Sequence, residues 1–141
     1  MPNKRIETDG APAAIGPYSQ AVSAGGWLFC AGQIALDPHT GSRVGDGDVE
    51  AETRQVLKNL DAVLTKAGAT RADVVKATVY LADMNEFSKM NQVYGEYFEG
   101  CVPPARACVQ AAALPKGVRV EIDFIARVGG LGNSLAVEGV S

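Results

Sequence analysis

Hydrophobic positions early in the chain form two short runs on either side of Gly25-Gly26, within residues 14–36. Adjacent glycines supply the positive φ angles that a tight hairpin turn requires. The pattern therefore predicts two β-strands joined by a hairpin.

Two later segments show the three-and-four spacing of apolar residues that is typical of a helix with one buried face. The first contains Val49, Thr53, Val56, Leu57, Leu60, Val63, Leu64 and Ala67. Asp46 or Asp48 would cap the start of this helix, and Gly68 would end it. The second segment contains Met84, Phe87, Met90, Val93, Tyr94 and Tyr97. We expect two amphipathic helices.

The segments around these helices predict further strands. Residues 72–83 are mostly apolar and β-branched, as in a strand covered on its faces, and two more strands are predicted at 105–111 and 118–126. The order strands, helix, strand, helix, strand, strand indicates an α+β single domain, with both helices packed on one face of a mixed β-sheet. The other face must then be polar or covered by another subunit, so we expect an oligomer.

Strand alternation assigns side chains to these two faces. In residues 105–111 the apolar set is expected to meet the helices, which places Arg106, Cys108 and Gln110 on the open face. In residues 118–126 the same reasoning places Arg119, Glu121 and Asp123 on the open face. A solvated sheet with surface ion pairs, worth under about 1 kcal/mol each, also explains this polar alternation.

Composition limits the class of protein. The chain has 141 residues, 47% of them hydrophobic, which suits one domain with a core. Its net charge of −3 comes without basic clusters, so nucleic acid is not an expected partner. The chain shows neither a secretory signal nor a membrane span, and we expect a cytoplasmic protein. Composition changes at Gly129, so we assign a domain to residues 1–128 and a tail to 129–141.

Cysteine and histidine give little support for a metal site or a nucleophile. Cys30, Cys101 and Cys108 are widely spaced, and the single histidine, His39, lies in a segment with the composition of an exposed loop. No CxxC or HxxxH pattern is present. We expect no disulfide framework, no metal and no Cys-His pair.

Several motifs together resemble the Rid family of enamine and imine deaminases, also called the YjgF or UK114 family. They are "APAAIGPYSQAV", "AGQIALDPHTG", "TRQVLKNL", "VVKATVYLADMNEF", "NQVYGEYF", "PARACV" and "LPKGVRVEIDFIA". The similarity runs from about Ala11 to Arg127, and the sequence is most similar to the archetypal deaminase subgroup. Its most specific part is an arginine after a small residue with a glutamate on the next strand, here Arg106 and Glu121.

The resemblance implies a chorismate-mutase-like fold that assembles as a homotrimeric barrel, with sites in clefts between subunits. It also implies hydrolysis of short-lived enamines and imines, such as 2-aminoacrylate, 2-iminopropanoate and 2-iminobutanoate, to 2-keto acids and ammonia. No cofactor is implied, and small imino and enamino acids would be the only partners besides the other subunits.

The resemblance also implies roles for individual residues. Arg106 would hold the substrate carboxylate, and Glu121 would bind the attacking water. The backbone of Gly32, the side chains of Tyr18 and Cys108, and Asn91 from a helix would complete substrate binding.

Some of these positions have a second interpretation. Glu121 would otherwise form an ion pair with Arg106 or Arg119, and Gly32 would simply mark a close strand approach or a bulge. Cys108 suits a small wall residue at least as well as a reactive thiol. Many relatives have Ser or Thr where this chain has Ala31, which bears on substrate range.

Other functions remain as alternatives. A family member without deaminase activity would be a small-ligand-binding trimer, a redox-regulated chaperone or a translation-inhibiting endoribonuclease. Chorismate mutase, suggested by the fold, would need several cationic groups around a dicarboxylate, and the chain offers few beyond Arg106.

Overall fold

The computed structural model describes residues 2–128. Its elements in chain order are β1 (Lys4–Ile6), β2 (Ala21–Ala24), β3 (Trp27–Gln33), α1 (Val49–Lys66), β4 (Val74–Leu81), α2 (Phe87–Tyr97), β5 (Ala105–Gln110) and β6 (Val120–Arg127), with short 3-10 turns η1 (Arg71–Asp73), η2 (Met84–Glu86) and η3 (Pro115–Gly117). The predicted order of strands and helices is confirmed, and β1 is an additional strand. The predicted tail, residues 129–141, lies outside the described residues.

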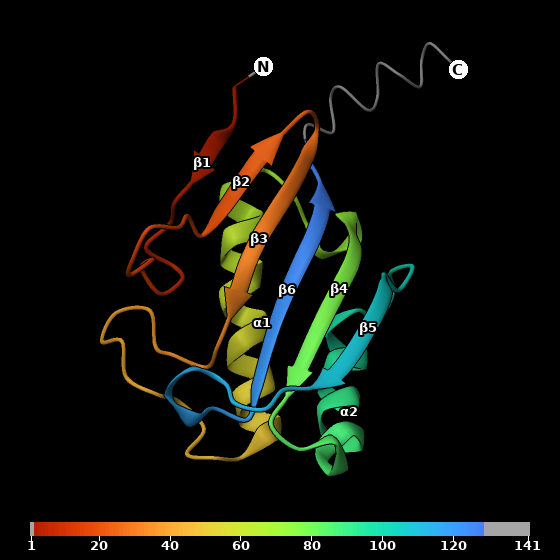
Figure 1. Ribbon diagram of the computed structural model, residues 1–141. Helices are drawn as coiled ribbons and strands as arrows, with labels where there is room; N and C mark the ends of the chain where they lie inside the picture. Colours follow the sequence, from red (N-terminus) through yellow and green to blue (C-terminus); the bar gives the residue numbers. More distant parts are fainter. Residues whose placement is uncertain (1, 129–141) are drawn as a thin grey trace.

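The strands form one mixed sheet in the order β1-β2-β3-β6-β4-β5. Strands β4 and β5 run parallel across the α2 crossover, whereas the other neighbours are antiparallel. Both helices lie on the same face of the sheet, α1 behind its centre and α2 behind β4 and β5 (Figure 1). The predicted α+β class with helices on one face is therefore confirmed.

Local sequence signals account for the boundaries of the early elements. Gly25 and Gly26 have φ angles of 58° and 87° and join β2 to β3 in the predicted hairpin. The Asp48 side chain caps α1 by accepting a hydrogen bond from the Glu50 N–H at 2.9 Å. Gly68 follows α1 with a φ of 84°, as a helix C-terminus favours.

The core lies between the sheet and the two helices. The apolar stripe of α1 packs against the inward residues of β3, β4 and β6, and these fully buried side chains include Leu28, Val56, Leu60, Val63, Leu64, Val79, Ile122 and Phe124. No helix among residues 2–128 is both long and apolar enough to cross a bilayer.

Strand β5 presents the opposite face from the one predicted. Arg106 pairs with Ala77, and Cys108 pairs with Val79, and both partners are fully buried on the helix side of β4. Paired residues share a face of the sheet. Arg106, Cys108 and Gln110 therefore lie on the helix side, and the alanines of β5 lie on the open side. The prediction was wrong because β5 is an edge strand with mostly exposed residues on both faces, where alternation does not identify the core.

The open face of the sheet carries large apolar side chains. Trp27, Phe29 and Val109 are between 43% and 47% exposed, and Phe29 pairs with Ile125 across β3 and β6. Exposed aromatic and branched side chains on a sheet face are typical of a surface that another molecule covers.

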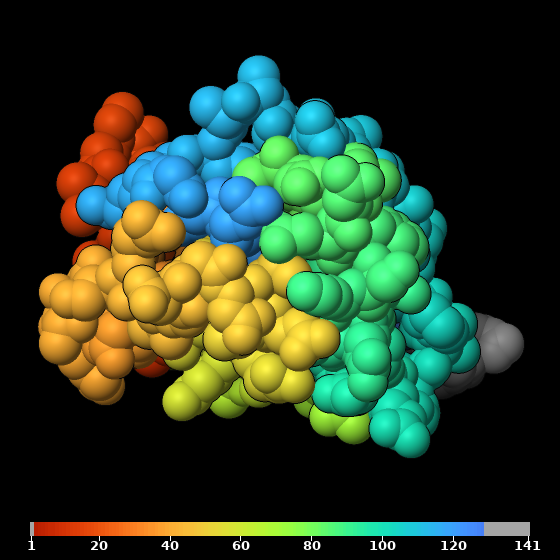
Figure 2. Space-filling model, turned by 90° about the horizontal axis from the view of Figure 1, so that it is seen from below, coloured from red at the N-terminus to blue at the C-terminus, as the bar shows by residue number. Residues whose placement is uncertain are grey.

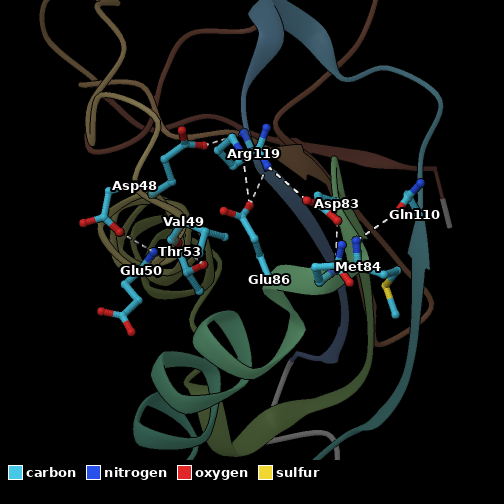
Figure 3. A network of polar contacts seen from close by, with 11 residues as sticks. Asp48, Val49, Glu50, Thr53, Asp83, Met84, Glu86, Gln110 and Arg119 are labelled. Carbon is cyan, nitrogen blue, oxygen red and sulfur yellow. Dashed lines mark hydrogen bonds and ion pairs between the residues drawn. The ribbon is translucent and has the colours of Figure 1, made fainter.

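Arg119 also lies elsewhere than predicted. It precedes β6, and its guanidinium donates two hydrogen bonds to Glu86 Oε1, at 3.0 and 2.8 Å, with Asp83 at 4.0 Å (Figure 3). Seen from below, the segment before β6 lies between the loop that precedes α1 and the start of α2 (Figure 2). The Arg119 side chain therefore links the start of β6 to the start of α2 and does not lie on the open face of the sheet.

A buried carboxyl group joins the same junction. Glu52 of α1 is 1% exposed, and its Oε1 accepts a hydrogen bond from the Arg119 backbone N–H at 2.8 Å. Its Oε2 is buried without a hydrogen-bond partner among the described residues. Burial raises the pKa of Glu52, and the hydrogen bond from Arg119 opposes this rise.

We predict that Glu52→Gln stabilises the protein at pH 7 by about 1 kcal/mol, because an amide costs less to bury than an ionised carboxylate. The folded protein holds the Glu52 proton more tightly than the unfolded chain, so the cost is present at neutral pH and disappears as pH falls toward the ordinary glutamate value. Thermal unfolding of both proteins between pH 4 and 8 measures this. Equal stabilities at pH 7 would show that Glu52 ionises without cost.

Candidate functional site

Five of the predicted site residues line two separate clefts, and the sixth, Cys108, lines neither. The first, of about 610 Å³, is enclosed by residues 12–18, the end of β3 and the start of β6. It is lined by Pro12, Ala13, Ile15, Tyr18, Ala31, Gly32, Gln33, Ile34, Leu36, Pro115, Lys116 and Glu121. We call it the Glu121 cleft. The second, of about 560 Å³, lies beside α2 and contains Arg106 and Asn91, and we call it the Arg106 cleft.

Gly32 brings the Glu121 carboxylate close to the backbone of β3. The pairing of β3 with β6 shifts register between Cys30 and Gln33, which places Gly32 in a bulge. A Cβ atom at position 32 would overlap Glu121 Oε2 and would lie 3.0 Å from its Cδ. A larger residue here would require the end of the Glu121 side chain to move, so Gly32 leaves room for this carboxylate beside β3.

The Glu121 carboxylate is half-buried and lies near a second carboxylate. Burial raises its pKa, and the neighbouring charge of Asp123 raises it further. Tyr80, which pairs with Glu121 across the sheet, donates a hydrogen bond to Asp123 Oδ2 at 3.3 Å. An elevated pKa gives Glu121 the basicity of a group that takes a proton from water.

Tyr18 belongs to a loop that is fixed by one buried amide. The Gln20 side chain accepts from the Thr8 N–H at 2.7 Å and donates to the carbonyl oxygens of Thr8, Ala11 and Pro12. These bonds hold residues 8–12 against the start of β2, while Tyr18 itself remains 54% exposed at the cleft.

The Arg106 guanidinium is exposed but held in one orientation. Its Nη1 donates to Asn91 Oδ1 at 2.7 Å, and its Cζ lies 4.7 Å from the centre of the Tyr94 ring and 5.4 Å from that of Phe87. These contacts come from α2 and use one N–H group of the guanidinium, while the aromatic rings pack against it. The other N–H groups can therefore donate two parallel hydrogen bonds to an anion such as a carboxylate.

Cys108 is a packing residue that lines neither cleft. It is half-buried and packs against the core from the helix side of β5. Burial raises the pKa of its thiol, and the Arg106 charge only partly opposes this. A thiol with a raised pKa is a poor nucleophile at neutral pH.

Within one chain these residues do not meet in one cleft, and the predicted sites between subunits stay a prediction. Tyr18, Gly32 and Glu121 lie together in one cleft, and Arg106 and Asn91 lie together in the other. Arg106 is paired with Ala77 and Glu121 with Tyr80, three residues further along β4, so the two side chains leave opposite faces of the sheet.

Phe87 and Tyr94, which support Arg106, and Lys116 of the Glu121 cleft were not identified as site residues from the sequence. Phe87 and Tyr94 fitted the apolar stripe of the second helix, and nothing in that pattern showed that they would support a guanidinium. Lys116 lies in the Pro115–Gly117 turn, where the sequence signals only a turn. Within residues 2–128, no three His, Cys, Asp or Glu side chains are grouped as metal ligands would be.

Comparison with known proteins assigns the chain to a family. The model of the Endoribonuclease L-PSP family matches residues 8–128. A RutC family protein of Pyrococcus horikoshii is 56% identical over 121 residues, covering 86% of this chain and 94% of that protein. The mouse protein named 2-iminobutanoate/2-iminopropanoate deaminase is 54% identical over 123 residues, covering 87% and 90%.

Solved structures agree with this assignment. The crystal structure of Escherichia coli TdcF with bound serine has a TM-score of 0.85 and 42% identity, covering 89% of this chain and 99% of that one. The YjgF gene product of the same bacterium has a TM-score of 0.84 and 43% identity, covering 88% and 98%. The resemblance seen in the sequence motifs is confirmed, and the chain belongs to the Endoribonuclease L-PSP family, which is also called the Rid or YjgF family.

Proposed function

We propose that the protein is a cofactor-independent deaminase that hydrolyses 2-aminoacrylate, 2-iminopropanoate and 2-iminobutanoate to 2-keto acids and ammonia. The observation that carries this proposal is the oriented, exposed Arg106 guanidinium, held by Asn91 and stacked on Tyr94. The names of the mammalian relatives support the same reaction.

Arg106 suits the recognition of a 2-imino acid because both groups are planar. A guanidinium can donate two parallel N–H bonds to a carboxylate, and this fixes the plane of the substrate as well as its position. The ring of Tyr94 and the amide of Asn91 restrict the guanidinium before the substrate arrives, so little conformational entropy is lost on binding.

The hydrolysis needs one water molecule and a group that moves protons. Water adds to the carbon of the C=N bond, the nitrogen takes protons, and the C–N bond breaks to leave a C=O group and ammonia. Glu121, with its raised pKa, accepts a proton from the water and returns it to the nitrogen. The enamine 2-aminoacrylate enters the same route after its carbon is protonated to give the imine.

The complete site forms between copies of the chain in this proposal. Arg106 and Glu121 lie on opposite faces of one sheet, so a substrate that touches both needs the Arg106 cleft of one copy beside the Glu121 cleft of another. The apolar open face, with Trp27, Phe29 and Val109 exposed, supplies a surface for assembly. We propose a homotrimer with three such shared sites, in line with the resemblance.

An endoribonuclease role, which the family model's name suggests, has less support here. The net charge is −3, and the charged residues lining the Glu121 cleft are Lys116 and Glu121. A protein that tracks an RNA backbone needs a row of cationic groups.

The first test is a coupled assay in which a threonine dehydratase generates 2-iminobutanoate and keto-acid release is followed. The wild-type protein should accelerate this release. Arg106→Lys should lose about 30- to 1,000-fold in kcat/KM, nearly as much as Arg106→Ala. The reason is that an ammonium group cannot make the bidentate contact, which is worth about 2 to 4 kcal/mol.

Light scattering on each variant controls for assembly. A lysine variant within a few-fold of wild type, with unchanged oligomeric state, would show that Arg106 acts only as a surface charge. Absence of any acceleration by the wild-type protein would contradict the proposed reaction itself.

The acid limb of the pH profile tests the role of Glu121. Because the Asp123 charge raises the pKa of Glu121, Asp123→Asn should lower that pKa. A general base works in its ionised form, so kcat/KM should then persist to lower pH than in the wild type. If the acid limb does not move, the essential ionisation belongs to another group. Cys108→Ser leaves both carboxylates in place and serves as the control variant.

A further inference from the structure

Lys116 adopts a backbone conformation that lysine rarely takes. Its φ and ψ angles are 56° and 17°, in the left-handed region. It is the third residue of a turn that begins at Leu114 and is closed by the Gly117 N–H bonding to the Leu114 carbonyl at 3.1 Å. With proline second, this position of the turn favours glycine, because a Cβ atom is strained there. A lysine at this strained position suggests that its side chain has a function, because glycine would fit the turn at a lower conformational cost.

The side chain of Lys116 lines the Glu121 cleft. Apart from Glu121 it is the one charged residue among those that line it, and the turn that carries it leads directly into β6. No carboxylate among residues 2–128 lies within ion-pairing distance of its ammonium group. The positive charge of Lys116 is therefore available to a ligand in the cleft.

The cleft needs such a charge if its ligand is an anion. Glu121 contributes a carboxylate to the lining, and Asp123 lies close enough to raise the pKa of Glu121. Both groups, when ionised, repel an imino acid, which carries its own carboxylate. Arg106 cannot offset this repulsion from within the same chain, because it lies in the other cleft.

We propose that Lys116 is a further substrate-recognition residue, whose ammonium group draws anionic imino acids into the Glu121 cleft. This proposal rests on the proposed function, since it concerns capture of the same substrate. Arg106 then fixes the plane of the carboxylate, while Lys116 raises the local concentration of the anion at the mouth of the cleft.

Lys116→Gly separates this role from a structural one, because it removes the charge and also relieves the backbone strain. We expect an unchanged or higher Tm, together with a fall in kcat/KM of about 3- to 10-fold at low ionic strength. The deficit should shrink in about 0.5 M salt, which screens exposed charges, while kcat should change less than about twofold. Lys116→Arg keeps the charge and should restore kcat/KM.

Asp46→Gly is the matched control for strain. Asp46 is the other described residue besides glycine with a positive φ, 47°, and it does not line the Glu121 cleft. Its replacement relieves similar strain and should leave kcat/KM unchanged. If Lys116→Gly also leaves kcat/KM and its salt dependence at wild-type values in an active enzyme, the capture role is wrong.

A binding measurement keeps this proposal apart from the proposed function. Calorimetry with 2-oxobutanoate, which carries the same carboxylate but undergoes no deamination, should show weaker binding to the Lys116→Gly variant at low salt. A wild-type protein that binds 2-oxobutanoate through Lys116 but hydrolyses no imine would overturn the deaminase function and support the anion-capture role. Binding that is equal in both proteins would overturn the capture role.

Discussion

The alternation of side chains along a β-strand is the constraint on which this structure depends. Arg106 and Glu121 are held by neighbours on β4 that lie three residues apart, so one side chain leaves the helix side of the sheet and the other leaves the open side. Within one chain the two side chains therefore enter different clefts. In the proposed mechanism, chemistry that uses both residues takes place between two copies of the chain, and the exposed aromatic residues of the open face offer a surface for their association.

The Arg106 cleft and the Glu121 cleft are built by different means. Aromatic stacking and one amide orient Arg106, which leaves its charge intact and its donors available. Partial burial and a neighbouring carboxylate tune Glu121, which raises its proton affinity. The bonds of Arg119 to Glu86 connect the start of α2, which supports Arg106, with the start of β6, which carries Glu121 (Figure 3). This junction connects the segments that carry the two clefts.

Much of this fold follows from local signals in the sequence. The glycine pair of the first hairpin, the cap and stop of α1, and the spacing of the apolar residues of α2 each depend on neighbours along the chain, and each prediction was correct. The orientation of β5 was wrong because an edge strand of small residues presents no strongly apolar face. The support of Arg106 by Tyr94 and the strain at Lys116 depend on tertiary contacts and backbone angles, which residue patterns do not contain. The candidate site residues could thus be named from the motifs, but the division of most of them between two clefts could not.

Complementation between two inactive variants tests the shared site most directly. Arg106→Ala damages one cleft and Glu121→Ala the other, so copies of the two variants in one assembly can still combine an intact Arg106 cleft with an intact Glu121 cleft. Random mixing in a trimer leaves about one site in four intact, and co-assembled variants should recover about a quarter of wild-type deaminase activity. If each chain instead builds its own site, the co-assembled mixture will be as inactive as the separate variants, and a site shared between copies is contradicted.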